Sequence, residues 1–167
     1  MEFTVVQGDI AEQRADVLVN AANTGLRMGS GVAGALRRRG GEALDRAAID
    51  EGPVELGGVA VTDAFDLHAD YVVHAAAMPA GGRATAGSIR DAAWNALTAA
   101  DELGAKSLVL PALGCGVAGF DLREGVGILL KEIDDFEPES LTDVRVIGYG
   151  EEEVAAIRDV ASEFSEH

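Results

Sequence analysis

Two glycine-rich hexamers carry the clearest chemistry in this sequence. Residues 29–34 read Gly-Ser-Gly-Val-Ala-Gly, and residues 114–119 nearly repeat them as Gly-Cys-Gly-Val-Ala-Gly. Each hexamer follows an apolar segment that predicts a strand and precedes a segment that predicts a helix. In this context backbone N–H groups can hold phosphates. One such hexamer is weak support for a site, but two of them, with the polar residues 20–23 before the first, favour a ligand that carries two phosphates.

The elements that must position these loops alternate along the chain. We expect strands at 3–7, 16–20, 59–62, 71–74, 107–111 and 144–147. We expect helices at 30–39, 42–51, 85–103 and 151–164, another beginning at 121 and a short helical turn at 11–14. Strands that alternate with helices predict an α/β fold with a mixed, mostly parallel sheet covered on both faces. Ligands of such sheets bind outside the carboxyl ends of the strands. Four segments, 8–10, 20–34, 111–120 and 148–150, should therefore converge.

Composition limits the classes of partner. The chain has 167 residues and a formal net charge of −16, which argues against nonspecific binding to the nucleic-acid backbone. Acid of this density fits a protein that stays soluble in concentrated salt, so we expect a halophilic source. The sequence has no apolar run long enough for a membrane span and no signal-peptide pattern at its start. We therefore expect a soluble, cytoplasmic protein.

Several residues have a structural explanation beside a functional one. Asp9 can cap the helical turn that follows it or accept a hydrogen bond from a ligand base. Cys115, the single cysteine, is explained as a small residue that fills loop space, because no His or Asn partner can be assigned to it as a nucleophile. We expect His74 and Trp94 to be core residues. The arginines at 37–39 suit the C-terminal end of a helix dipole, which gives them a sufficient structural role.

Taken together, residues 8–10, 19–23, 29–36 and 111–120 resemble the macro domain, a module that binds ADP-ribose. The resemblance covers nearly the whole chain. It implies a three-layer α/β/α sandwich around a six-stranded mixed, mostly parallel sheet, formed by residues 1–167 as a single domain. It implies ADP-ribose or an ADP-ribosylated protein as the partner, and we expect a monomer without metal or cofactor.

The resemblance also implies the role of each site residue. Asp9 would bind the adenine amino group, Ile10 would be a backbone contact beside it, and Asn23 would bind the distal ribose. Tyr149 matches the position that stacks on adenine, and Phe120 would border the distal ribose. The diphosphate would be held by the backbone of Gly31, Val32, Ala33 and Gly34 in the first loop and of Gly114, Cys115, Gly116, Val117, Ala118 and Gly119 in the second. Asn20 would be structural.

Recognition by backbone is consistent with the charge of the chain. A protein with a net charge of −16 has to bind a dianion, and neither loop contains lysine. Backbone amides and helix N-termini provide donors without side-chain charge. Glycine is needed there because a Cβ would block the approach of the backbone to the diphosphate.

Whether the chain is an enzyme depends on one position. Many macro domains that remove ADP-ribose from proteins, or that deacetylate O-acetyl-ADP-ribose, have an Asp that positions water where this chain has Ala33. Related sequences with Ala there are binders, some with hydrolysis attributed to the residue that corresponds to Asn23 and to a phosphate-held water. A binder with slow or no hydrolysis and a competent hydrolase both remain open.

The rival interpretation is a nicotinamide-dinucleotide oxidoreductase. Residues 29–34 fit its fingerprint, and Asp50 or Glu51 lies near the offset of about 20 residues expected for a ribose-binding acid. Against it, the first glycine lies nine residues beyond Asn20, whereas the fingerprint follows its strand directly. The chain is also short for an added catalytic domain.

Overall fold

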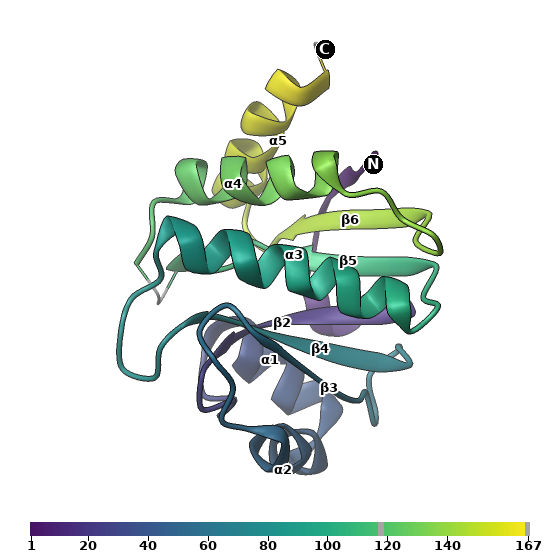
Figure 1. The fold of residues 1–167 in the computed structure, drawn as a ribbon, viewed down its shortest axis with the longest axis vertical. Helices are drawn as coiled ribbons and strands as arrows, with labels where there is room; N and C mark the ends of the chain where they lie inside the picture. The colour runs from purple at the N-terminus through teal and green to yellow at the C-terminus, as the bar shows by residue number, and fades with distance from the viewer. Residues whose placement is uncertain (117–118, 166–167) are drawn as a thin grey trace.

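Six strands form one mixed sheet at the centre of the protein (Figure 1). The structure is a computed structural model, and it describes residues 1–116 and 119–165. The strands are β1 (Thr4–Gln7), β2 (Val17–Asn23), β3 (Val59–Asp63), β4 (Tyr71–Met78), β5 (Ser107–Pro111) and β6 (Asp143–Gly148). Their order in the sheet is β1-β6-β5-β2-β4-β3, and every pair is parallel except β3 with β4. The mixed, mostly parallel sheet is therefore confirmed.

Helices cover both faces of the sheet. They are α1 (Gly31–Gly40), α2 (Glu42–Glu51), α3 (Ala86–Glu102), α4 (Leu122–Asp135) and α5 (Glu151–Ser165), with a 3₁₀ turn η1 (Ile10–Glu12) after β1. Helices α3 and α4 cross the near face in Figure 1, whereas α1 lies behind the strands. Two separate apolar clusters match this division, one shared with α3, α4 and α5 and the other with α1 and α2. The expected three-layer α/β/α sandwich is confirmed.

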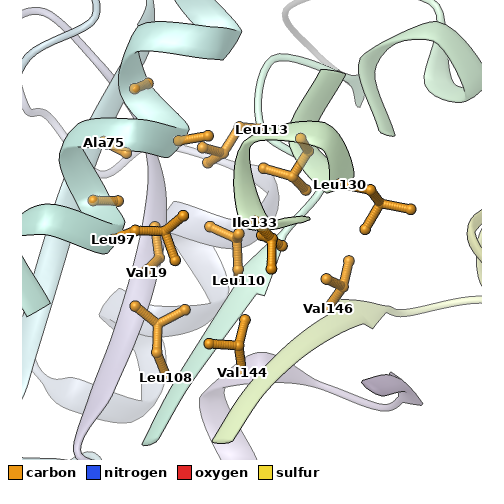
Figure 2. Close-up of a cluster of buried hydrophobic side chains, with 14 of the residues drawn as sticks. Val19, Ala75, Leu97, Leu108, Leu110, Leu113, Leu130, Ile133, Val144 and Val146 are labelled. Atoms are coloured by element: carbon orange, nitrogen blue, oxygen red, sulfur yellow. The ribbon is translucent and has the colours of Figure 1, made fainter. Parts of the chain in front are cut away.

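The two clusters arise because successive side chains of a strand point to opposite faces of the sheet. Val17 and Val19 of β2 belong to the α3 side, whereas Leu18 between them belongs to the α1 side. Because neighbouring strand residues point to opposite faces, a central parallel strand has to be apolar at almost every position. Figure 2 shows the α3 side, where leucine and isoleucine side chains of two helices meet the sheet, with Leu97, Leu130 and Ile133 over Val19, Leu110 and Val146.

Two strands extend further than the sequence predicted. Strand β2 continues to Asn23 and β4 to Met78, although we expected them to end at Asn20 and His74. Their added residues pair with each other, with Ala21 opposite Ala75 and Ala22 opposite Ala76. Alanine has low strand propensity, but pairing within the sheet outweighs that preference. The polar residues 20–23 are thus the end of a strand and not a link between strand and loop.

A buried row of polar side chains crosses three strands on the α1 side. Thr62 Oγ1 donates to the carbonyl of Asp63 (3.0 Å), so the Nε2–H of His74 donates to Thr62 Oγ1 (2.9 Å). His74 Nδ1 then accepts from Asn20 Nδ2 (3.0 Å). The geometry therefore fixes a neutral His74 with its proton on Nε2. His74 is a core residue and Asn20 is structural, as the sequence predicted.

Trp94 is not the core residue that we expected. Its side chain is 40% exposed, and its ring packs edge-on against Phe136 with centroids 5.2 Å apart. The buried stripe of α3 runs instead through smaller residues, among them Ala93 and Ala96, with Ile89 and Leu97. Alanines let the helix approach the sheet closely, and the tryptophan is left at the margin between α3 and the end of α4.

We predict a loss of stability in acid that originates at His74. Burial lowers the pKa of His74 from 6.5 to about 4. Between these values the unfolded chain binds a proton that the folded protein does not. The part of the free energy of unfolding that depends on neutral His74 is therefore fully present above pH 6.5 and is lost as pH falls toward 4. Its size is about 3 kcal/mol. Urea unfolding across this range should show a steeper decline for the wild type than for His74→Gln.

The same prediction has a direct readout in case His74→Gln does not fold. The imidazole proton signals of wild-type His74 in an NMR titration should stay in the neutral form well below pH 6.5. A titration midpoint at or above 6.5 would contradict the burial argument.

Candidate functional site

A cavity of about 600 Å³ opens at the carboxyl ends of the parallel strands. Its walls come from the ends of β1, β2, β4, β5 and β6 and from the first two turns of α1. This is the edge where α/β sheets bind ligands, and the volume lies within the range of small-molecule sites, about 300–1,000 Å³. The predicted convergence of four separate segments therefore occurs in the fold.

The N-terminus of α1 faces this cavity. Gly31 and Val32 line it, and Ser30 before them is extended and makes no capping hydrogen bond with its side chain among the described residues. The first helical hydrogen bond runs from Gly34 N to Ser30 O (3.2 Å), so the amides of residues 31–33 precede it. The positive end of the helix and these N–H groups, which precede its first helical hydrogen bond, are arranged to receive an anion.

The second glycine loop lines the same cavity. Gly114 (φ +75°) packs so closely on α3 and the segment before it that a Cβ would lie 2.7 Å from Ile89 and 2.8 Å from Ala84. Gly116 (φ +72°) is open instead, and no atom of residues 1–116 and 119–165 outside its chain neighbours lies within 4 Å of a Cβ position. Both line the cavity together with Cys115. The loop is thus fixed against the core on one side and offers its backbone on the other. Val117 and Ala118, also predicted for this site, lie outside the described residues.

Asp9 is both a helix cap and a cavity residue. Its Oδ1 accepts a hydrogen bond from Ala11 N (2.9 Å), which caps η1 as the sequence predicted. Asp9 also lines the cavity beside Ile10 and Tyr149, because β1 and β6 are neighbours in the sheet. Tyr149 is 75% exposed, so its ring is available to a ligand. The two explanations of Asp9, cap and ligand contact, are therefore compatible.

Five predicted site residues with described positions do not line the cavity: Asn23, Ala33, Gly34, Gly119 and Phe120. Ala33 and Gly34 lie on the buried side of α1, and Ala33 is 6% exposed. Asn23 ends β2, and its Oδ1 accepts from Gly25 N (2.9 Å), which leaves Nδ2 as a donor. Phe120 pairs with Cys115 across the base of the second loop. The ligand roles of these five residues stay predictions.

The three arginines at 37–39 have different surroundings. Arg37 pairs with Glu42 (2.8 Å), and Arg39 lies 3.6 Å from Glu12. Arg38 lines the cavity and makes no ion pair within residues 1–116 and 119–165. From the sequence we expected one role for all three, at the C-terminal end of a helix. In the structure Arg38 differs from its neighbours because it lines the cavity.

Cys115 is a packed thiol and not an activated one. Burial, together with the nearby carboxylates of Glu153 and Asp121, raises its pKa to about 11. Its Sγ donates weakly to the carbonyl of Leu113 (3.6 Å) and occupies the space that a Cβ on Gly125 would need. Because the thiolate is the nucleophilic form, this environment disfavours nucleophilic chemistry. The space-filling role expected from the sequence fits these contacts.

Sequence reasoning missed four residues of the cavity wall that matter for its shape and charge. Ala77 and Met78 were missed because β4 was expected to end at His74, although an alanine run directly follows. Arg38 and Glu153 lie on helices, one at the second turn of α1 and one in the first turn of α5. Burial raises the pKa of Glu153, against a hydrogen bond from the backbone of Tyr149.

Within the described part of the chain, no three His, Cys, Asp or Glu side chains gather where they could bind a metal ion. Among the same residues, no helix is both long and apolar enough to cross a bilayer.

Related proteins of similar sequence come from bacteria and archaea. The chain is 41% identical over 152 residues to an uncharacterized protein of Mycobacterium tuberculosis, which covers 90% of this chain and 42% of that protein. It is 39% identical over 158 residues to an uncharacterized protein of Pyrobaculum aerophilum, covering 91% and 86%. The chain thus spans about two fifths of the length of its mycobacterial relatives.

Solved structures of similar fold are macrodomains. The Trypanosoma brucei macrodomain in complex with ADP-ribose superposes with a TM-score of 0.85 at 25% identity, covering 94% of this chain and 68% of that one. A mutant of the Oceanobacillus iheyensis macrodomain gives a TM-score of 0.89 at 26% identity, covering 97% and 92%. The model of the Macro domain family matches residues 19–129. With these relatives, that match shows that the chain belongs to the Macro domain family.

Proposed function

We propose that residues 1–167 act as a single, monomeric domain that binds ADP-ribose, free or attached to a protein. The observation that carries the proposal is the single cavity lined by both the N-terminus of α1 and the loop of Gly114 and Gly116. Two sets of backbone amides beside one cavity match a diphosphate. The similar Trypanosoma brucei macrodomain, solved with ADP-ribose, supports the same ligand for this chain.

The cavity suggests an orientation for that ligand. The diphosphate would lie between Gly31 and Gly116, and adenine would lie toward Asp9 and Tyr149 at the ends of β1 and β6. The distal ribose would then lie toward the ends of β2 and β4, where Asn23 Nδ2 can donate a hydrogen bond. Backbone recognition suits a chain of net charge −16, because it adds no positive side chain.

The oxidoreductase alternative is not supported. The first glycine hexamer begins six residues after β2 ends at Asn23, so it does not form the tight strand-to-helix turn of a dinucleotide fingerprint. Asp50 and Glu51, the acids at the required offset, are exposed at the end of α2 and do not line the cavity.

For catalysis we propose slow hydrolysis of ADP-ribosyl esters or of O-acetyl-ADP-ribose at most. Ala33 provides no general base, and the described carboxylates of the cavity, Asp9 and Glu153, belong to its β1 and β6 side. General-base help is worth about 10²–10⁴-fold. Without it, the ligand's own phosphate has to hold the water, and Asn23 would orient the distal ribose as the candidate catalytic residue.

We also propose that the protein works in a cytoplasm of high salt. Acidic residues outnumber basic ones by 29 to 13. Concentrated salt screens the resulting self-repulsion, which is strongest at low ionic strength.

The binding proposal predicts that Gly116→Glu abolishes ADP-ribose binding, measured by isothermal titration calorimetry. The new carboxylate would lie where the diphosphate binds. Gly104→Glu is the matched control, because Gly104 has the same left-handed backbone (φ +78°) and equally open surroundings but lies at the end of α3. Tight binding by Gly116→Glu, or equal loss in both variants, would contradict the proposal.

The orientation of the ligand predicts selective effects at Asp9. Asp9→Ala should weaken ADP-ribose by about 10-fold or more, through loss of a charge-assisted hydrogen bond to adenine, and leave ribose 5-phosphate unchanged. Asp9→Asn retains an oxygen that can cap η1, so it separates ligand contact from loop folding. Equal losses for both ligands would rule out the adenine contact.

The catalytic proposal predicts slow release of ADP-ribose from proteins mono-ADP-ribosylated on Glu or Asp and slow deacetylation of O-acetyl-ADP-ribose. Asn23→Ala should lower the single-turnover rate by more than it lowers ADP-ribose affinity, since orientation matters most at the reacting ribose. Product can be followed by chromatography. Turnover as fast as that of an efficient hydrolase would show that another group replaces the missing carboxylate.

A further inference from the structure

One face of α1 lines the cavity over two turns. The residues of this face are Gly31, Ala35 and Arg38, spaced four and then three apart, which is the spacing of neighbours on a helix surface. Arg37 and Arg39 are turned away from this face by about 100° each, and both have carboxylate partners elsewhere. Among the three arginines, helical geometry therefore assigns only Arg38 to the cavity.

The side chain of Arg38 points back toward the start of α1. Its Nη1 lies 3.3 Å from the position that a Cβ would take on Gly34, and the carbonyl oxygen of Gly29 lies 3.1 Å from the same position. Side chains of helices lean toward the N-terminus, so this direction is expected. The guanidinium is thus beside the glycine turn whose amides face the cavity.

Arg38 matters because of the other charges on the cavity wall. The other charged residues of the described wall are Asp9 and Glu153, both acidic. A dianionic ligand therefore enters a site where Arg38 is the sole described cationic side chain of the wall, in a protein of net charge −16. Guanidinium groups match phosphate oxygens with paired N–H donors.

Building on the proposed function, we propose that Arg38 contacts the diphosphate of bound ADP-ribose and makes the cavity selective for dianionic nucleotides over neutral nucleosides. The backbone amides of the two loops position the phosphates, and Arg38 compensates the repulsion that the acidic wall imposes on them. Arg38 is exposed, so this attraction is screened by salt. The affinity for ADP-ribose therefore contains one salt-sensitive component beside the amide contacts.

The test compares Arg38→Gln with wild type by calorimetric titration of ADP-ribose and of adenosine, at low and at molar KCl. Arg38→Gln should weaken ADP-ribose about 5–10-fold at low KCl and much less at molar KCl, and leave adenosine within about twofold. The matched control is Arg158→Gln, which removes the same charge from an exposed site on α5 outside the cavity wall. It should leave ADP-ribose binding unchanged.

Three outcomes would overturn the inference. Equal affinities of Arg38→Gln and Arg158→Gln would make Arg38 a solvated surface residue. Equal losses for adenosine and ADP-ribose would place the contact on the nucleoside. A loss that does not shrink in molar KCl would exclude a screened charge contact. Failure of the wild type to bind ADP-ribose would instead overturn the proposed function itself, and this is visible before any variant is compared.

Discussion

The parallel pairing of β2 with β4 and β5 is the interaction on which the cavity depends. It sets the ends of three strands side by side, so that the loops after β2 and β5 line one cavity although they lie about 85 residues apart in the sequence. Both faces of these strands are buried, which fixes their register through the packing of two apolar clusters. The site is therefore positioned by the core and not by contacts among the loops themselves.

The sequence predicted the sheet and the two glycine loops because their signals are local. Apolar runs with β-branched residues such as 17–19 indicate buried strands, and glycines at fixed spacing indicate turns. The ends of β2 and β4 could not be predicted in this way. Ala21 and Ala22 of β2 are strand residues because Ala75 and Ala76 of β4 pair with them, and this information is not local.

The candidate site was predictable as backbone more than as side chains. Glycine residues at 31, 114 and 116 line the cavity as expected. Each has a positive φ, which few other residue types adopt, so the glycines mark these turns in the sequence. The charged side chains of the cavity wall were not predictable. Arg38 and Glu153 reach the cavity from helices, and the rotation of a helix about its axis depends on how it packs. Trp94 shows the same limit, because helical spacing alone placed it on the wrong side of the boundary between core and surface.

The alanines at the ends of the strands have a consequence for the cavity itself. Ala21, Ala22, Ala77 and Ala112 are among the residues that line it, and each has a side chain of one carbon. Their methyl groups leave the space that a valine or leucine would fill, so the size of the residues at these strand positions sets the depth of the cavity. The space at this edge of the sheet can thus change by single methyl groups while the two glycine loops stay the same.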